Sequence, residues 1–380
     1  MSKKLFSLGI LLLFSAQVLL SQVSTKVEPQ EEKKTTEEQK VNPVSKPIET
    51  KKPAVTQPAP APKPTDFYEL YKSSQVSDRR KAIDNIGRKR DSKDAQILID
   101  ALSDSDSGVK VSAIDSLGLM REQLAADKII LALKDKEPQV RQSACVALGY
   151  IGDSKAQPAL VERVKNDSSN SVRTQAILIL GNMHANIAVD TLIPLLKDKN
   201  LDVCYLSAEA LGKIGDPKAT SALKNCLANS ITEMKNETDS YRNNQYKRLI
   251  TVTAKALGNL KDKSSEDTLI GLLDNNEKSI KIAAASALGS IGNNSGLSVA
   301  MKLAEDSNEI IKIQAIEALG NIGDPAAIPV LETIADNDPN NNIKETARAS
   351  LYRVGWKPAP PKKPTSTKPA QSKPATQKGN

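Results

Sequence analysis

One phrase of fourteen residues organises most of this chain. At 140–153 it is Val-Arg-Gln-Ser-Ala-Cys-Val-Ala-Leu-Gly-Tyr-Ile-Gly-Asp, and it recurs in altered form to give nine copies. Successive copies are 31 or 32 residues apart, except for one interval of 46 residues between the fifth and sixth. A fixed period of this length predicts a solenoid of stacked repeats, which is first of all a surface for holding partners. The copies begin at Asp78, Val109, Val140, Val172, Val203, Leu249, Ile280, Ile311 and Ile343.

Each copy predicts a pair of antiparallel helices. In the fifth copy, apolar or small residues recur at Val203 and at positions +4, +8 and +11 from it, which form one face of an α-helix. Gly215, at position +12, suits the left-handed residue that ends a helix, and Asp216-Pro217 suits the start of the next one. Neither helix can bury its apolar face alone, so the copies must stack into one core. The second helix is expected to bury Ala219, Leu223 and Leu227.

Composition divides the chain into four parts. Residues 1–21 combine Lys3 and Lys4 with an apolar run, which predicts a secretory signal peptide, or alternatively an uncleaved membrane anchor. Residues 22–65 are rich in Pro, Lys and Glu and predict a disordered linker. The repeats occupy 66–356, where Asp66 caps a short first helix and Trp356 covers the last repeat. Residues 357–380 predict a disordered tail of lysines and prolines.

The net charge of +8 belongs to the ends of the chain. The tail contributes +6, and the signal peptide and the linker contribute +2 each, which leaves about −2 for the repeats. A nucleic-acid-binding solenoid would carry its positive charge on the folded surface, so we expect no nucleic-acid partner. The basic tail could contact anionic envelope surfaces weakly, or be a soluble extension only.

The phrase resembles HEAT repeats, specifically the short class called PBS-lyase HEAT-like, over about residues 66–356. The resemblance implies an all-α fold, a right-handed α-solenoid of about nine two-helix repeats. Relatives include scaffolds, bilin lyase subunits and deoxyhypusine hydroxylase, which binds two irons through His-Glu pairs. The single histidine, His184, is followed by Ala185, so that metal site cannot be assembled. The resemblance therefore predicts the fold strongly and the function weakly.

Catalytic signatures do not emerge from the sequence. His184 stands at position +12, where sister copies have glycine, so it is expected to end a helix. No phosphate-binding loop, Ser-His-Asp set or Cys-His pair is present, and we expect no catalytic residue, no metal and no cofactor. The cysteines are odd in number, so they cannot all pair within one chain. They are expected to be small buried residues, at least at Cys226, and their redox state stays open. The three are Cys145, Cys204 and Cys226.

Two charged columns run through the copies. Position +1 is basic in seven copies, including Arg141 and Arg173, and position −5 is Asp in six. We expect these columns to form a structural ladder, with a partner-binding stripe as the alternative. Cys204 and Ile250 interrupt the basic column on either side of the long interval. The insertion, at about 231–247, is a loop that binds a partner, a solvated loop, or simply longer helices. Candidate partner-binding residues are Tyr205, Glu209, Tyr241, Arg242, Tyr246, Lys247, Arg141 and Arg173.

These observations together favour a non-enzymatic scaffold or adaptor for an unidentified protein partner in a bacterial cell envelope. Two alternatives remain: an enzyme-associated or lyase-like subunit, and a structural envelope protein tethered by its tail or by an uncleaved anchor. Export to the periplasm or beyond is expected from residues 1–21, with anchoring in the inner membrane as the other outcome. The sequence does not determine the oligomeric state.

Overall fold

A computed structural model describes residues 66–357, and these residues are helical throughout apart from turns and short connections. The expected signal peptide, linker and nearly all of the tail lie outside the described residues. Nine helices contain the repeated phrase. They are α3 (Val76–Lys89), α5 (Ser107–Met120), α7 (Pro138–Ile151), α9 (Asn170–Asn182), α11 (Leu201–Ile214), α13 (Ser240–Asn259), α15 (Lys278–Ser290), α17 (Glu309–Ile322) and α19 (Asn341–Arg353).

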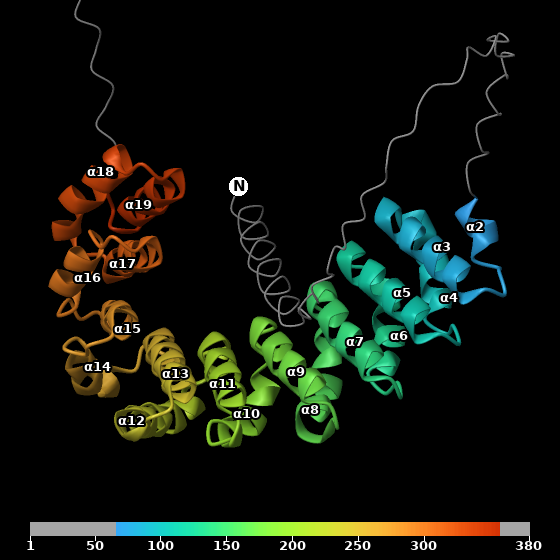
Figure 1. The fold of residues 1–380 in the computed structure, drawn as a ribbon, viewed down its shortest axis with the longest axis horizontal. Helices are drawn as coiled ribbons and strands as arrows, with labels where there is room; N and C mark the ends of the chain where they lie inside the picture. The colour runs from blue at the N-terminus through green and yellow to red at the C-terminus, as the bar shows by residue number, and fades with distance from the viewer. Residues whose placement is uncertain (1–65, 358–380) are drawn as a thin grey trace, which may run out of the picture. The chain divides into compact units, whose positions relative to one another are not determined.

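A second helix follows each of the first eight phrase helices. These are α4 (Ala95–Ala101), α6 (Ala126–Ala132), α8 (Gln157–Asn166), α10 (Val189–Leu195), α12 (Thr220–Asn236), α14 (Glu266–Leu272), α16 (Leu297–Leu303) and α18 (Ile328–Asn337). The phrase helices stack on one another and line the inner side of a curved array, while the second helices lie outside (Figure 1). This arrangement confirms the predicted α-solenoid of two-helix repeats.

The core lies between the two layers. Leu211 and Leu257, both at position +8, have at most 1% of their surface exposed. Position +9 is glycine, and a Cβ atom on Gly212 would lie 2.7 Å from the Cβ of Ala256 in the next repeat. The missing side chain of glycine permits this approach of neighbouring helices, and the facing residue at +7 is most often Ala, although Ser116 and Ile179 also occur there. The expected apolar face of α12 is confirmed, because Ala219, Leu223 and Leu227 are fully or almost fully buried.

The helix-ending signal is confirmed in every repeat. All nine residues at position +12 have a positive φ, which is the left-handed conformation that glycine adopts most readily. His184, with a φ of 50°, is one of them, as the sequence predicts. Its Nδ1 lies 2.5 Å from the carbonyl oxygen of Lys213. The others are Gly152, Gly215, Gly292, Gly323 and Gly355, together with Arg90, Arg121 and Lys261.

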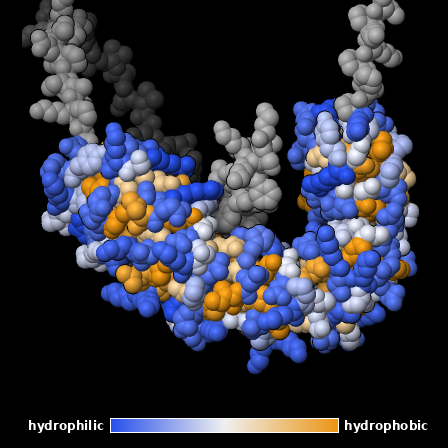
Figure 2. Space-filling view, turned by 180° about the vertical axis from the view of Figure 1, so that it is seen from behind, coloured by the Kyte–Doolittle hydropathy of each residue, from blue (hydrophilic) through white to orange (hydrophobic). Residues whose placement is uncertain are grey.

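Both ends of the array carry the expected caps. Asp66 accepts a hydrogen bond from the Tyr68 N–H at 2.9 Å and so starts α2 (Phe67–Leu70), which packs on α3. At the other end, Trp356 stacks edge-on against Tyr352, with ring centroids 6.1 Å apart, and donates to Glu332. On the face in Figure 2, hydrophobic residues form separate patches divided by hydrophilic side chains.

Candidate functional site

The ion-pair ladder is confirmed at four rungs. In each rung, the basic residue at position +1 of one repeat reaches the Asp at position −5 of the next. The aspartates also accept hydrogen bonds from the backbone N–H two residues further on, so they anchor the turn before each phrase helix. The rungs are Arg79–Asp104 at 2.8 Å, Lys110–Asp135 at 2.7 Å, Arg141–Asp167 at 2.7 Å and Lys312–Asp338 at 2.9 Å.

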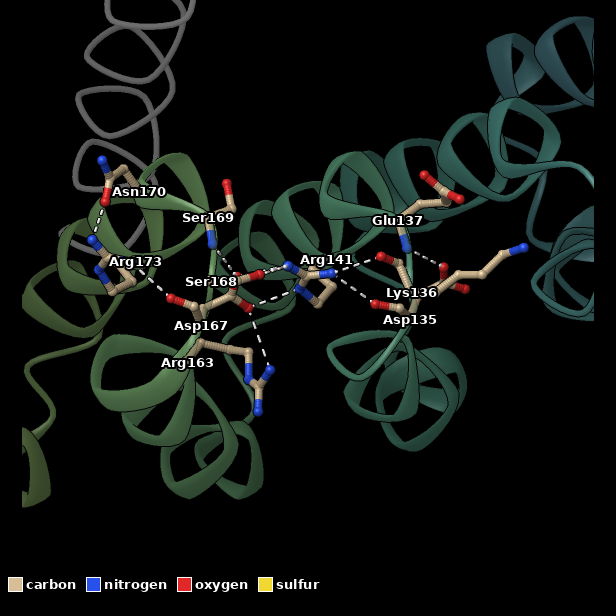
Figure 3. Close-up of polar contacts among 10 residues, drawn as sticks. All are labelled: Asp135, Lys136, Glu137, Arg141, Arg163, Asp167, Ser168, Ser169, Asn170 and Arg173. Atoms are coloured by element: carbon tan, nitrogen blue, oxygen red, sulfur yellow. Dashed lines mark hydrogen bonds and ion pairs between the residues drawn. The ribbon is translucent and has the colours of Figure 1, made fainter.

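In the rung formed by Arg141, the guanidinium donors are engaged within the fold (Figure 3). Its Nε and Nη2 donate to the two carboxylate oxygens of Asp167 at 2.8 and 2.7 Å, and its Nη1 donates to the carbonyls of Asp135 and Lys136. Burial alone would raise the pKa of Asp167, but hydrogen bonds from Arg141 and the Ser169 N–H outweigh it and hold the pKa below its usual value. Arg141 thus has little left to offer a partner.

Arg173, the next candidate in the basic column, is also engaged within the fold. Its Nη1 donates to the carbonyl of Asp167 at 2.7 Å, and its Nη2 donates to Asn170 (Figure 3). Both contacts are to residues just before or at the start of its own helix, α9. The two arginines proposed from the sequence as partner-binding residues therefore serve the turns and the ladder.

The ladder stops on both sides of the long interval. Cys204 and Ile250 occupy position +1, and both are buried. Position −5 of each following repeat is then Asn244 or Asn275 instead of Asp. Both members of these two rungs are thus replaced together. The inner surface of repeats five to seven is therefore not committed to this ladder.

Two other pairs of the columns, Arg173 with Asp198 and Lys281 with Asp306, form no ion pair within residues 66–357. Arg173 instead contacts Asp167 and Asn170, and Asp306 contacts Lys278.

The insertion consists mainly of longer helices. α12 has 17 residues, whereas the other second helices have 7 or 10, and α13 has 20, whereas the other phrase helices have 13 or 14. The extra residues add turns to both helices, so the longer-helix interpretation of the sequence holds and the loop interpretation does not. Tyr246 is 7% exposed within α13, and Arg242 contacts Glu237 at 2.9 Å across the connection. Tyr241, which is 67% exposed, lies at the start of α13.

A groove of about 740 Å³ opens at this place, between α11, α13 and α15. Three of the residues proposed from the sequence line it, namely Tyr205, Glu209 and Lys247. One wall is formed by Asn244, Lys247 and Arg248 of α13, and of these Asn244 lies in the N-terminal extension of the helix. The groove also contains cations that the sequence analysis did not select. These are Lys213, Arg248 and Lys255.

The polar groups of the groove are linked in pairs. The Arg248 guanidinium lies 4.8 Å from the centre of the Tyr205 ring, and Lys213 contacts Glu209 at 2.7 Å. Lys247 contacts Glu277 at 2.8 Å, which joins α13 to the start of α15. Burial raises the pKa of Tyr205, and the neighbouring Glu209 raises it further. The phenol therefore remains a neutral hydrogen-bonding group at physiological pH.

Periodicity could have identified the missed residues. Glu209 and Lys255 both stand at position +6, and Lys213 and Asn259 both stand at +10. These positions lie on the inner face of the phrase helices, as Tyr205 at +2 does. Arg248 stands at −1, one helical turn before Thr251 and Val252, a position that is helical in every repeat, whereas Asn244 at −5 is helical only because α13 is extended. The sequence alone does not indicate that extension.

Across 66–357, no three His, Cys, Asp or Glu side chains converge in an arrangement that could hold a metal ion. Cys145, Cys204 and Cys226 are free thiols, all buried, as expected for small core residues. Burial raises the pKa of the Cys145 thiol to about 12 and that of Cys204 to about 11, so neither is a ready nucleophile. Within the same range, no helix is both long and apolar enough to span a membrane.

Comparison with protein-family models identifies HEAT repeats at residues 126–186, 158–237 and 272–352. The chain belongs to the HEAT-repeat family. This HEAT-repeat protein matches no curated protein sequence. The second match ends at residue 237, directly after the extended α12, and the third begins at residue 272, so α13 lies outside the matched residues.

Solved structures show the same fold. The complex of CpcE and CpcF of phycocyanin lyase from Nostoc sp. PCC7120 is similar with a TM-score of 0.51 and 21% identity, over 60% of this HEAT-repeat chain and 86% of that one. The Escherichia coli protein YibA has a TM-score of 0.42 and 21% identity, over 74% and 100% of the two chains. Human deoxyhypusine hydroxylase has a TM-score of 0.31 and 17% identity, over 71% and 99%. At 21% identity, the likeness to the phycocyanin lyase complex is one of fold.

Proposed function

We propose that this HEAT-repeat protein is a non-enzymatic scaffold that binds a protein partner on its inner face, at the groove between α11, α13 and α15. One observation carries the proposal: the groove opens where both columns of the structural ladder are replaced. Elsewhere along the ladder, cations such as Arg79 and Arg141 are used within the fold. In the groove, an aromatic ring, a guanidinium and several amines face a hollow instead, which is typical of an interface.

The position of the groove supports this function. HEAT repeats generally mediate protein–protein interaction, and inner helices present their side chains at the regular spacing of the repeats. The groove lies on such helices, whose rigid packing at Gly212 and Ala256 fixes the distance between neighbouring walls. A preformed surface of this kind binds without the entropic cost of ordering a loop.

A photo-cross-linking residue in place of Tyr205 tests the proposal directly. In cells, this variant should give a covalent product with one protein species, identified by mass spectrometry. The matched control places the same residue at Leu131, which is 62% exposed on the outer helix α6 and should give no such product. Equal products at both positions, or none at position 205, would reject the inner face as the binding surface.

We further propose that the scaffold works in the cell envelope, with residues 1–21 directing export. Cell fractionation combined with N-terminal sequencing of the mature protein separates a processed, exported protein from one that keeps its anchor. Recovery of the intact chain from the cytoplasm would reject export. The alternative of a lyase-like subunit has its own check, because incubation of the purified protein with a bilin should leave no covalently attached chromophore in its absorbance spectrum.

A further inference from the structure

We infer that the groove between α11, α13 and α15 takes an extended acidic segment of the partner protein. This inference rests on the proposed function and assigns the chemistry of the occupant. The lining of the groove contains four cations, which are Lys213, Lys247, Arg248 and Lys255. It contains two acids, Glu209 and Glu277, so its formal charge is positive, whereas the repeats as a whole carry about −2. Complementary charge on the partner would guide both encounter and register.

Lys255 is the cation most available to a ligand. It is exposed at position +6 of α13, and its amine makes no hydrogen bond or ion pair with any residue in 66–357. Lys213 contacts Glu209 at 2.7 Å and donates to the Asn182 side chain at 2.9 Å. Lys247 contacts Glu277 at 2.8 Å. An ammonium group has three donors, so these two retain capacity for a second carboxylate.

Arg248 is held in an orientation suited to a carboxylate. Its guanidinium lies over the Tyr205 ring at 4.8 Å, and its Nη1 is 3.7 Å from Asp202. Stacking fixes the plane of the guanidinium while leaving most of its five N–H donors unused. A carboxylate from the partner could then form two parallel hydrogen bonds with it, the strongest geometry for this pair.

Glu209 supplies the complementary element, an acceptor for a peptide backbone. Its Oε1 binds Lys213, but its Oε2 is buried and has no hydrogen-bond partner among the described residues. A buried carboxylate oxygen without a donor is rare and unfavourable. A shift of the Glu209 side chain toward the groove would let the N–H of an extended segment satisfy this oxygen, and neutral groups such as Thr251 and Asn244 line the same hollow.

The length of the depression favours a segment over a small anion. A neighbouring hollow of about 180 Å³ shares Lys255, Asn259 and Gln314 with the groove and continues across α15 to α17. The two hollows together cross four phrase helices. Glu317 lines the far hollow, so the positive charge is concentrated toward α11 and α13. An extended chain of several residues can follow this path, and its acidic side chains would lie nearest α13.

A binding assay with the full chain tests the inference. Fluorescein-labelled peptides of alternating glutamate and glycine, lysine and glycine, or serine and glycine, each ten residues long, are titrated by fluorescence anisotropy. We expect the glutamate peptide to bind best, and Lys255→Glu to weaken it by about fivefold or more, because an attractive contact becomes repulsive. The matched control is Lys128→Glu, the same charge change at an exposed residue of α6.

The control separates the groove from the basic tail, since the tail is identical in both variants. Equal weakening by Lys255→Glu and Lys128→Glu, or tighter binding of the lysine peptide, would overturn the inference. Circular dichroism of both variants establishes that the helices are intact. If a partner is cross-linked at position 205 but the protein shows no preference for the glutamate peptide, the inference of an acidic occupant is wrong, and the proposed scaffold function is still supported. Failure of both assays would overturn both proposals.

Discussion

Arg141 and Asp167 join two successive repeats through a pair of parallel hydrogen bonds of 2.8 and 2.7 Å, and the carboxylate side chain has no exposed surface. Asp167 also receives Arg163 at 3.3 Å and the Ser169 N–H at 2.9 Å. The carboxylate thus links α7, α8 and the turn before α9. Because this rung is buried and makes the most contacts, removal of one of its partners should lower the free energy of unfolding more than at any other rung.

Replacement of Asp167 by Ala is expected to lower the free energy of unfolding by about 3 kcal/mol, because Arg141 would remain buried without its counter-ion. Urea denaturation followed by circular dichroism measures the change. Lys278→Ala is the control, since Lys278 is 55% exposed where it contacts Asp306, and exposed pairs contribute about 0–1 kcal/mol. Equal losses in the two variants would show that burial of the rung does not determine its contribution.

The ladder also predicts how stability depends on pH. Hydrogen bonds from Arg79 to Asp104 and from Lys278 to Asp306 hold both pKa values below the usual range, and Asp167 is lowered despite its burial. A depressed pKa contributes stability that is present above the unfolded-state value, about 3.9 for Asp, and is lost as the pH falls through the folded-state value. The melting temperature should therefore hold above pH 5 and fall below about pH 4.

Asp167→Asn isolates the contribution of one rung to this profile. The stability difference between the wild-type protein and this variant should be largest at pH 7 and shrink below about pH 4, because protonated Asp resembles Asn. Thermal unfolding at half-unit pH steps gives the comparison. A difference that stays constant down to pH 3 would mean that Asp167 does not titrate in this range.

The repeat unit was predictable because its signals are local and occur nine times. Helix periodicity, the residue at +12 and the paired charges each appear in many copies, so even His184 and Arg121 could be compared with Gly215. The same columns reveal that Cys204 and Asn244 replace the two members of one rung. This joint replacement becomes evident only when a rung is seen to join successive repeats.

The groove was predictable only in part, because it depends on a feature that occurs once. Nothing in the residues around 231–247 distinguishes a loop from two longer helices, since both are polar. The helical extension adds Asn244 to the wall formed by Lys247 and Arg248, which stand at positions −2 and −1 that are helical in every repeat. It also buries Tyr246 and leaves Tyr241 exposed, a division that depends on tertiary packing.

The three cysteines should be unreactive toward a thiol reagent such as Ellman's reagent in the native protein at pH 8. The thiolate is the reacting species, and burial raises the pKa of Cys145 to about 12 and that of Cys204 to about 11. Burial also raises the pKa of Cys226. In urea all three should react rapidly. Rapid modification of any thiol without denaturant would contradict the buried positions and point to local opening of its repeat.

The left-handed residue at +12 gives a pair of opposite predictions. Arg121 has a φ of 54°, which costs a residue with a side chain about 1 kcal/mol, so Arg121→Gly should raise the unfolding free energy by up to that amount. Gly215 has a φ of 78°, and a Cβ atom there would meet nothing within 4 Å. Gly215→Ala should therefore lose about 1 kcal/mol through backbone strain alone.

Urea denaturation of both variants, alongside the wild-type protein, checks the two signs together. His184→Gly is a third variant for this comparison of unfolding free energies. It relieves the backbone strain at a φ of 50° but loses the contact between the imidazole ring and the Lys213 carbonyl. Its net effect should therefore be smaller than that of Arg121→Gly. Destabilisation by Arg121→Gly would show that the arginine at this position is selected for a contact rather than tolerated as a helix-ending residue.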